Sequence, residues 1–306
     1  MSGKTVVVTG ASRGLGYWTA LSVARKGASV FILGRKSPQA TAALAEIADA
    51  SAGPAPQLIE CDLLDFESVR MAAAALRELA AEIDVLCCNA GIMCQPDEAS
   101  KDGYDITMAT NVLSHFLLAR ELMPALEKAA VRAGEARVVS MSSGSGFGPP
   151  GFDAALYERR GGRLGGPERA YDRYHQSKLG NLAFTAALHE RLRERGSAVK
   201  ALACTPGVCA TDMFVHVQSL ARPGQAVDMA AVPCVEDGVL GQLLCICDPS
   251  VASGELWGPP GLGGLPVRIA MEPPKVLVDE AAKEGVWEAC ERAVGAWDLK
   301  HTAASA

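Results

Sequence analysis

The stretch "KTVVVTGASRGLG", Lys4–Gly16, joins a short β-branched run to a turn with three glycines. Such an apolar, β-branched run is typical of a strand that is covered on both faces. Gly10, Gly14 and Gly16 let the chain turn sharply and leave bare backbone at the start of the next helix, where a phosphate can approach. A purely structural glycine-rich turn remains the alternative, because the G-x-G-x-x-G spacing is not present.

Strand-like and helix-like segments alternate after this turn. We expect further strands over residues 28–35, 56–63, 83–91, 136–143 and 198–207, and helices over 14–27, 37–51, 65–82, 102–130, 171–195 and 274–297. This alternation predicts an α/β fold, a parallel sheet with helices on both faces. Without tandem repeats or an evident linker, it favours a single doubly wound Rossmann-type domain over residues 1–306. We expect an insertion at about 144–171, a substrate loop at about 208–235 and a C-terminal extension at about 259–306.

Composition excludes several classes of function. The net charge is -6 and aromatic residues are few, which disfavours nucleic acid or an anionic membrane as a partner. Ten cysteines lack a C-x-x-C pair and lie mostly in apolar runs, so we interpret them as buried hydrophobes and expect no metal. The first strand leaves no room for a signal or transit peptide, and no apolar run has the length of a transmembrane segment. These features favour the cytoplasm or another reducing compartment.

The segment "YDRYHQSKLGN", 171–181, places Tyr174 and Lys178 one helical turn apart. Tyrosine has a pKa of about 10, and a neighbouring ammonium group lowers it by favouring the tyrosinate. The pair therefore suits proton exchange with a reacting oxygen. An interface tyrosine beside a solvated lysine is the alternative. Tyr171 is a poorer candidate, because the residue four positions later is His175.

Several motifs together resemble the short-chain dehydrogenase/reductase family. The glycine turn has the family's T-G-x-x-x-G-x-G spacing, and "CNAG" (88–91) differs from the family's N-N-A-G only at Cys88. "TNVLSHFLL" supplies Asn111, "SMSSGSG" supplies Ser143, and Tyr174-x-x-x-Lys178 and Pro206-Gly207 follow in the family's order. The long separation of Ser143 from Tyr174 and the S-K-L-x-N signature resemble the retinol dehydrogenase-like and protochlorophyllide reductase-like branch.

The resemblance implies a catalytic set of four residues. Tyr174 would be the general acid/base, and Lys178 would lower its pKa and hold the nicotinamide ribose. Ser143 would donate a hydrogen bond to the substrate oxygen, and Asn111 would anchor a water. Ser143 and the alternative serine, Ser142, could instead cap a turn, and Asn111 could merely satisfy backbone groups.

The end of the second strand indicates NADP(H) as the cofactor. Gly34 stands where an acidic residue would hold the NAD ribose, and Arg35 and Lys36 follow. Together with Arg13, these cations suit a 2′-phosphate, although two surface cations are the alternative. The cofactor-binding residues that the resemblance implies are Gly10, Ser12, Arg13, Gly14, Leu15, Gly16, Arg35, Lys36, Asp62, Leu63, Asn89, Ala90, Gly91, Tyr174, Lys178, Pro206, Gly207, Val208 and Thr211, with Asp62 against the adenine.

The substrate is expected to be a lipophilic aldehyde, ketone or alcohol. Loops over a rigid sheet commonly carry specificity, and apolar residues in these loops are candidates for the pocket wall: Met93, Phe147, Met213, Phe214 and Val215. Arg159, Arg160, Arg163, Arg169 and Arg173 could recognise an anionic group or keep the insertion solvated. Reduction of a C=C bond and a non-enzymatic NADP sensor remain alternatives, and a homodimer or homotetramer is possible.

Overall fold

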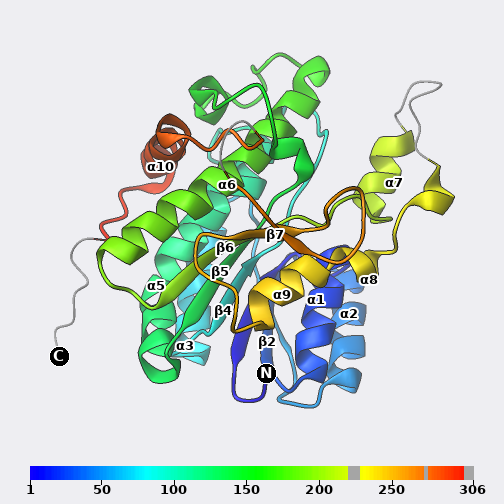
Figure 1. The fold of residues 1–306 in the computed structure, drawn as a ribbon, viewed down its shortest axis with the longest axis vertical. Coiled ribbons are helices and arrows are strands. Elements are labelled where there is room, and N and C mark those ends of the chain that lie inside the picture. The colour runs from blue at the N-terminus through cyan, green and yellow to red at the C-terminus, as the bar shows by residue number, and fades with distance from the viewer. Residues whose placement is uncertain (220–227, 272–274, 300–306) are drawn as a thin grey trace.

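The computed structural model describes residues 1–219, 228–271 and 275–299 and contains one eight-stranded sheet, ordered β3-β2-β1-β4-β5-β6-β7-β8 (Figure 1). Its strands are β1 Thr5–Thr9, β2 Ser29–Gly34, β3 Gln57–Glu60, β4 Val85–Cys88, β5 Ala136–Met141, β6 Val199–Cys204, β7 Leu256–Gly258 and β8 Val267–Ile269. The order reverses between β1 and β4. Their carboxyl ends therefore open a crevice, which is where this type of sheet binds ligands.

The doubly wound Rossmann-type fold predicted from the sequence is confirmed, with one correction at the sheet edge. The strands from β3 to β7 are parallel, but β8 runs antiparallel to β7, with Leu256 opposite Ile269. The sequence analysis missed β7 and β8, because each has only three residues. A run this short carries no readable periodicity.

Helices cover both faces of the sheet (Figure 1). α1 (Gly14–Arg25), α2 (Pro38–Ala50) and α9 (Leu240–Cys247) pack on one face, and α3 (Phe66–Leu79), α5 (Ser114–Ala133), α6 (Ala170–Glu194) and α10 (Glu280–Val294) on the other. The valines of β1 alternate between the two cores: Val6 and Val8 face the first set of helices and Val7 the second. This alternation explains why the run is apolar throughout. None of the helices within the described residues combines the length and hydropathy needed to cross a membrane.

The helix expected over 102–130 begins later and is not uniform. It consists of α4 (Ile106–Met108), a π-helical segment η1 (Ala109–Leu113) and α5. Asp105 fixes its start, because the carboxylate accepts hydrogen bonds from the Thr107 and Met108 N–H groups at 2.9 and 3.0 Å. The wide turn of η1 contains Asn111. Such π-turns occur frequently at functional sites.

The insertion at 144–171 contains three short 3₁₀ turns, η2 (Gly144–Gly146), η3 (Ala154–Tyr157) and η4 (Pro167–Arg169). Asp97 anchors its later part, since its carboxylate accepts the N–H groups of Gly162, Leu164 and Gly166 at 2.7–2.9 Å. Tyr157 is buried and donates to the Gln176 carbonyl at 3.1 Å. The insertion therefore belongs to the packed body of the molecule.

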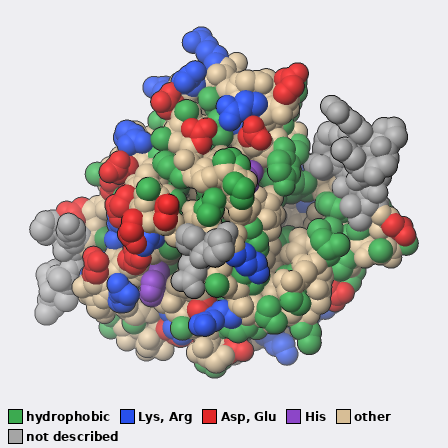
Figure 2. All heavy atoms as spheres, turned by 45° about the horizontal axis from the view of Figure 1, so that its top comes forward, with side chains coloured by type: hydrophobic (Ala, Val, Ile, Leu, Met, Phe, Trp, Pro, Cys, Tyr) green, Lys and Arg blue, Asp and Glu red, His purple; other side chains and the backbone are tan. Residues whose placement is uncertain are grey.

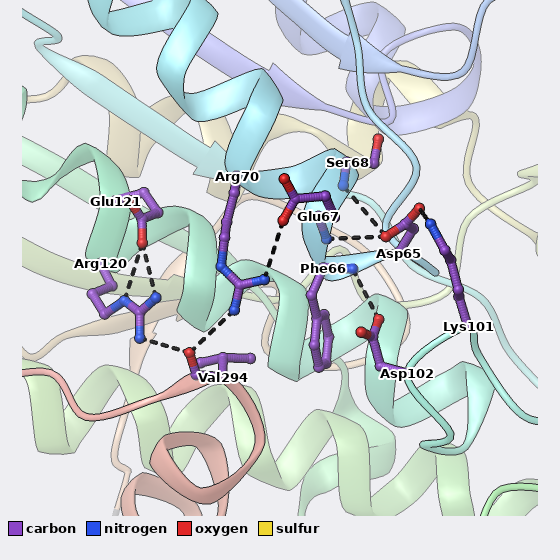
Figure 3. Close-up of polar contacts among 10 residues, drawn as sticks. All are labelled: Asp65, Phe66, Glu67, Ser68, Arg70, Lys101, Asp102, Arg120, Glu121 and Val294. Atoms are coloured by element: carbon purple, nitrogen blue, oxygen red, sulfur yellow. Dashed lines mark hydrogen bonds and ion pairs between the residues drawn. The ribbon is translucent and has the colours of Figure 1, made fainter.

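The C-terminal extension returns to pack on α5 and α6. The helix expected over 274–297 is α10, Glu280–Val294, and Asp279 caps it by accepting the Ala282 N–H. Figure 3 shows Arg70 of α3 and Arg120 of α5 pointing at the Val294 carbonyl, which accepts from both at 3.4 and 2.8 Å. These guanidinium groups satisfy a carbonyl at the negative end of the α10 dipole.

Three short helices complete the substrate-loop region. They are α7 (Asp212–Ser219), η5 (Met229–Ala231) and α8 (Val235–Gly238). Part of the predicted substrate loop, residues 220–227, lies outside the described residues, as do residues 272–274 and 300–306 of the extension.

Candidate active site

A single cavity of about 1140 Å³ lies at the carboxyl ends of the strands. Every catalytic and cofactor-binding residue expected from the sequence lines it, except Asn111. Its remaining walls come from segments far apart in the chain, including Ser145, Tyr171, Leu262 and Ile269. The sheet therefore gathers the predicted residues into one place.

The glycine turn is tightly packed, so only glycine fits at two of its positions. Gly10 has φ +68°, and a Cβ there would lie 2.9 Å from the Ala90 Cβ. A Cβ at Gly16 would lie 2.5 Å from the Asn89 Nδ2. α1 begins at Gly14 with no side-chain cap and no acidic residue in its first turn. Its N–H groups and positive dipole end therefore remain open to an anion.

The end of β4 is braced against β1. The Thr9 hydroxyl accepts the N–H groups of Asn89 and Ala90 at 3.0 and 2.9 Å, and the Asn89 side chain donates to the Thr9 carbonyl at 2.9 Å. Cys88, the departure from the family motif, is a buried thiol beside this network. Asn89 and Thr9 thus brace the strand without a side-chain amide at position 88.

Tyr174 and Lys178 lie on α6 and reach the cavity from its floor. Both side chains are almost completely buried. The Lys178 Nζ donates to the Met141 carbonyl at 3.0 Å and lies 5.7 Å from the centre of the Tyr174 ring. The lysine is therefore fixed to the end of β5 and is not a solvated charge.

Burial controls the pKa values of this pair. It raises the pKa of Tyr174 to about 12, while the hydroxyls of Ser143 and Ser145 act in the opposite direction. It lowers the pKa of Lys178 to about 8. The Tyr174 pKa thus moves opposite to the sequence expectation, because the lysine nitrogen is directed at Met141 and desolvation dominates.

The two candidate serines differ in what their hydroxyls contact. Ser142 is buried and donates to the Lys178 carbonyl at 2.8 Å, so its hydroxyl proton is already in use. Ser143 accepts the Ser145 N–H at 3.2 Å and caps η2. This bond leaves the Ser143 proton free to be donated into the cavity.

Asn111 is fully buried behind the cavity wall. Its side chain exchanges hydrogen bonds with the Ile92 backbone at 2.9 and 3.0 Å and donates to the Ser177 hydroxyl at 2.9 Å. It therefore ties the segment after β4 to α6 beside Lys178. This arrangement matches the alternative in which Asn111 satisfies backbone groups.

Cations gather at the end of the cavity beside β2. Arg35 is exposed and forms no ion pair with any residue that the structure describes. Lys36 pairs with Glu60 at 2.9 Å, and Arg13 pairs with Asp212 of α7 at 3.2 Å. All these charges are exposed, so an anionic ligand can compete for them.

The opposite end of the cavity is apolar. Met93, Phe147, Met213 and Phe214 line it as expected, whereas Val215 faces solvent. In Figure 2, hydrophobic side chains flank a hollow in this face of the molecule. The cavity thus has one cationic and one apolar end.

A family model for short chain dehydrogenases matches residues 4–157. The chain belongs to the short-chain dehydrogenase/reductase family. It is 31% identical to human polyprenol dehydrogenase over 70% of this chain and 63% of that protein, and 31% identical to mouse retinol dehydrogenase 14 over 96% and 87%. These relatives support the retinol dehydrogenase-like branch. The chain spans less than two thirds of the length of several relatives, including human polyprenol dehydrogenase.

Solved structures share this fold. An uncharacterized protein from Mycobacterium paratuberculosis superposes with a TM-score of 0.74, at 29% identity, over 96% of this chain and 94% of that one. A short chain dehydrogenase from Shigella flexneri, solved in complex with NADP, gives a TM-score of 0.64 at 22% identity over 84% and 97%. At that identity the second comparison supports the fold alone.

None of the five arginines expected in the insertion lines the cavity. Arg173 is fully buried and pairs with Asp105 at 3.0 Å, donating also to the Gly166 and Gln95 carbonyls. It therefore fits neither the expected anion-binding role nor the solvated one. It fixes the start of α6, immediately before Tyr174.

Sequence reasoning missed several residues of the cavity wall. Leu262 and Ile269 come from the extension, whose two short strands gave no signal. Ser145 belongs to the same "SMSSGSG" segment, but the sequence analysis considered only Ser142 and Ser143 as the catalytic serine. Most of the ten free cysteines are buried, and the described residues contain no group of three or more ligands suited to a metal.

Proposed function

We propose that this short-chain dehydrogenase is an NADP(H)-dependent oxidoreductase that transfers a hydride between nicotinamide and a carbonyl or alcohol of a lipophilic small molecule. The observation that carries the proposal is the single cavity. It joins an open helix N-terminus, a group of cations, a buried tyrosine–lysine pair and an apolar end.

The residues of the cavity fit a dinucleotide. The open N-terminus of α1 suits a pyrophosphate, and the close contacts of Gly10 and Gly16 leave no side chain to obstruct it. Asp62 and Leu63 would flank the adenosine, Asn89 to Gly91 the middle of the cofactor, and Pro206 to Thr211 its nicotinamide end. When bound, the reduced nicotinamide supplies the hydride.

Tyr174 would donate the proton that accompanies hydride transfer to a carbonyl. With its pKa raised to about 12, the phenol keeps its proton at neutral pH and can pass it to an oxygen that becomes an alkoxide. Ser143 would hold that oxygen with its free hydroxyl proton. Lys178, whose pKa is lowered to about 8, would orient the cofactor ribose and return a proton to Tyr174.

The phosphate preference rests on Arg35. It is the exposed cation beside β2 that has no anionic partner among the described residues, and Gly34 before it offers no carboxylate to a ribose hydroxyl. Guanidinium groups bind phosphate through paired N–H donors. We therefore assign the site to NADP(H) over NAD(H).

The lipophilic substrate class rests on the apolar end of the cavity. Met93, Phe147, Met213 and Phe214 offer no charge or hydrogen-bond donor to a sugar or phosphate. Burying an apolar ligand against them is favourable at about 25 cal/mol per Å².

The test is NADPH consumption across a panel of hydrophobic aldehydes and ketones, polar carbonyls, phosphorylated carbonyls and enones. We expect kcat/KM to be highest for the hydrophobic carbonyls. A preference for the polar or phosphorylated set would contradict the apolar pocket. Analysis of the enone products separates carbonyl reduction from reduction of the C=C bond.

Three assignments from the sequence stay predictions. They are the single domain over residues 1–306, a cytoplasmic or other reducing compartment, and a homodimer or homotetramer. Ten free cysteines are consistent with the compartment.

A further inference from the structure

Ser145 lines the cavity with Ser143 and Tyr174, on a turn whose backbone is held by several hydrogen bonds. Its N–H donates to the Ser143 hydroxyl at 3.2 Å, and its carbonyl accepts from the His175 ring. The second ring nitrogen of His175 contacts the Pro150 carbonyl at 2.8 Å. The backbone of Ser145 is therefore held by η2, by α6 and, through His175, by the insertion.

The turn also lies directly on α6. A Cβ at Gly146 would come within 2.7 Å of the Leu179 nitrogen and of the Lys178 carbonyl carbon. Because glycine permits this contact, Ser145 is placed against the helix that carries Tyr174. Both residues line the cavity.

The Ser145 hydroxyl lies beside the Tyr174 hydroxyl, whose pKa it lowers, but it forms no hydrogen bond of good geometry with any described residue. Its Oγ is buried from solvent and belongs to a residue that lines the cavity. A buried hydroxyl without a partner costs free energy, so folded proteins rarely keep one without reason. A ligand oxygen entering the cavity would supply the missing partner.

We propose that Ser145 donates a hydrogen bond to the substrate oxygen, as a further catalytic residue beside Tyr174 and Ser143. This inference rests on the proposed function. A carbonyl oxygen has two lone pairs, and the alkoxide formed by hydride transfer has three, so it can accept from three hydroxyls. Donors aimed at a developing oxyanion stabilise it in the transition state.

The atoms and electrons of the step balance. When bound, the reduced nicotinamide would supply the hydride of the new C–H bond and would be left oxidised, while the π electrons of the C=O bond move to oxygen. Tyr174 then transfers its proton to that oxygen. Ser143 and Ser145 keep their protons and contribute hydrogen bonds only.

The experiment compares Ser145→Ala with Thr107→Val in the full-length protein. Thr107 is a matched control, because its hydroxyl is also buried without a partner but does not line the cavity. For each variant, kcat and KM are measured with NADPH and the best carbonyl of the panel. NADPH affinity by fluorescence and the thermal unfolding midpoint are measured alongside.

We expect Ser145→Ala to lower kcat by about tenfold to a hundredfold, since the other two hydroxyls remain. Its NADPH affinity and unfolding midpoint should match the wild type, and Thr107→Val should keep its kcat. A Ser145→Ala variant with wild-type kcat would overturn the inference, as would a fall in kcat that follows lost stability or lost NADPH binding. A wild type that reduces no carbonyl would remove the proposed function and this inference with it.

Discussion

At the scale of single residues, burial favours the uncharged form of the groups around the proposed reaction centre. The pKa is raised for Tyr174 and lowered for Lys178 and, to about 4, for His115. His115 lies between β1 and η1: its Nε2 contacts the Thr9 hydroxyl at 2.9 Å and its Nδ1 the Asn111 carbonyl at 3.1 Å. A carbonyl can only accept, so Nδ1 carries the proton. Nε2 then accepts from Thr9, whose oxygen already accepts two N–H groups.

His115 should make the fold sensitive to acid. Its pKa falls from 6.5 to about 4 on folding, so the unfolded chain binds a proton more readily. Above pH 6.5, His115 is mostly neutral in both the folded and the unfolded chain, so its burial does not reduce stability. As the pH falls from 6.5 to 4, the unfolded chain takes up a proton at His115 and the free energy of unfolding should decrease. The expected loss is about 3 kcal/mol for this shift. Urea unfolding of the wild type and His115→Gln across this pH range checks it; equal pH dependence in both proteins would contradict the assignment.

Arg35 should set the choice of cofactor. Arg35→Asp exchanges a phosphate donor for an acceptor suited to a ribose hydroxyl, so the ratio of kcat/KM for NADPH to that for NADH should fall by at least about tenfold. Arg193→Asp, at an exposed position near the end of α6, makes the same change of charge away from the cavity. A wild type that uses NADH as well as NADPH would refute this interpretation of "LGRK".

At the scale of elements, the insertion is a fixed wall held by α6. Gln176 contacts it twice: its Nε2 donates to the Gly151 carbonyl at 2.7 Å, and its Oε1 accepts the Asp153 N–H at 2.9 Å. Tyr157 packs so closely that a Cβ at Gly180 would lie 2.1 Å from its hydroxyl oxygen. The insertion thus supports the helix that carries Tyr174 and Lys178 at Gln176 and Gly180.

Gly180→Ala should therefore destabilise the protein by about 1–3 kcal/mol, the usual cost of overpacking. In a Tyr157→Phe background the oxygen is gone, and the nearest ring atom would be 3.3 Å from the new Cβ. The cost of Gly180→Ala should then be smaller. Denaturant unfolding of the four proteins in this double-mutant cycle measures the difference, and an equal cost in both backgrounds would disprove the contact.

Much of this element order was predictable from the sequence, because its long strands and helices have strong periodicity and their glycines fall at turns. Many of the residues that line the cavity were likewise predictable from motifs that follow successive strands, but Leu262 and Ile269 of the extension were not. Three further features were not predictable. The π-turn at Asn111 and the three-residue strands β7 and β8 leave no periodic signal, and the buried Arg173–Asp105 pair looks like two ordinary surface charges in a sequence. The direction of the Tyr174 pKa depends on burial, which spacing does not reveal.

At the scale of the whole molecule, the C-terminal extension completes the core. Trp287 and Trp297 stack with ring centroids 5.2 Å apart, and Trp287 contacts Phe116 of α5 edge-on at 5.0 Å. Arg191 of α6 covers the Trp287 ring with its guanidinium 4.1 Å from the ring centre. The chain end thus joins the two long helices behind the cavity.

Trp287→Ala should destabilise the protein by about 3–5 kcal/mol, because it removes a large buried ring from this aromatic cluster. Trp287 does not line the cavity, so KM for the carbonyl should be unchanged in the folded fraction. Calorimetry combined with kinetics well below the unfolding midpoint tests both statements. A variant as stable as the wild type would show that the extension is not part of the core.

The most direct test of the proposed chemistry is Tyr174→Phe, which removes the phenolic oxygen and keeps the buried ring. We predict that the variant binds NADPH as tightly as the wild type and unfolds at the same temperature. Its kcat for the best hydrophobic carbonyl should fall by at least about a hundredfold, as expected when a general acid is lost. A variant that binds NADPH and turns over at close to the wild-type rate would contradict the account.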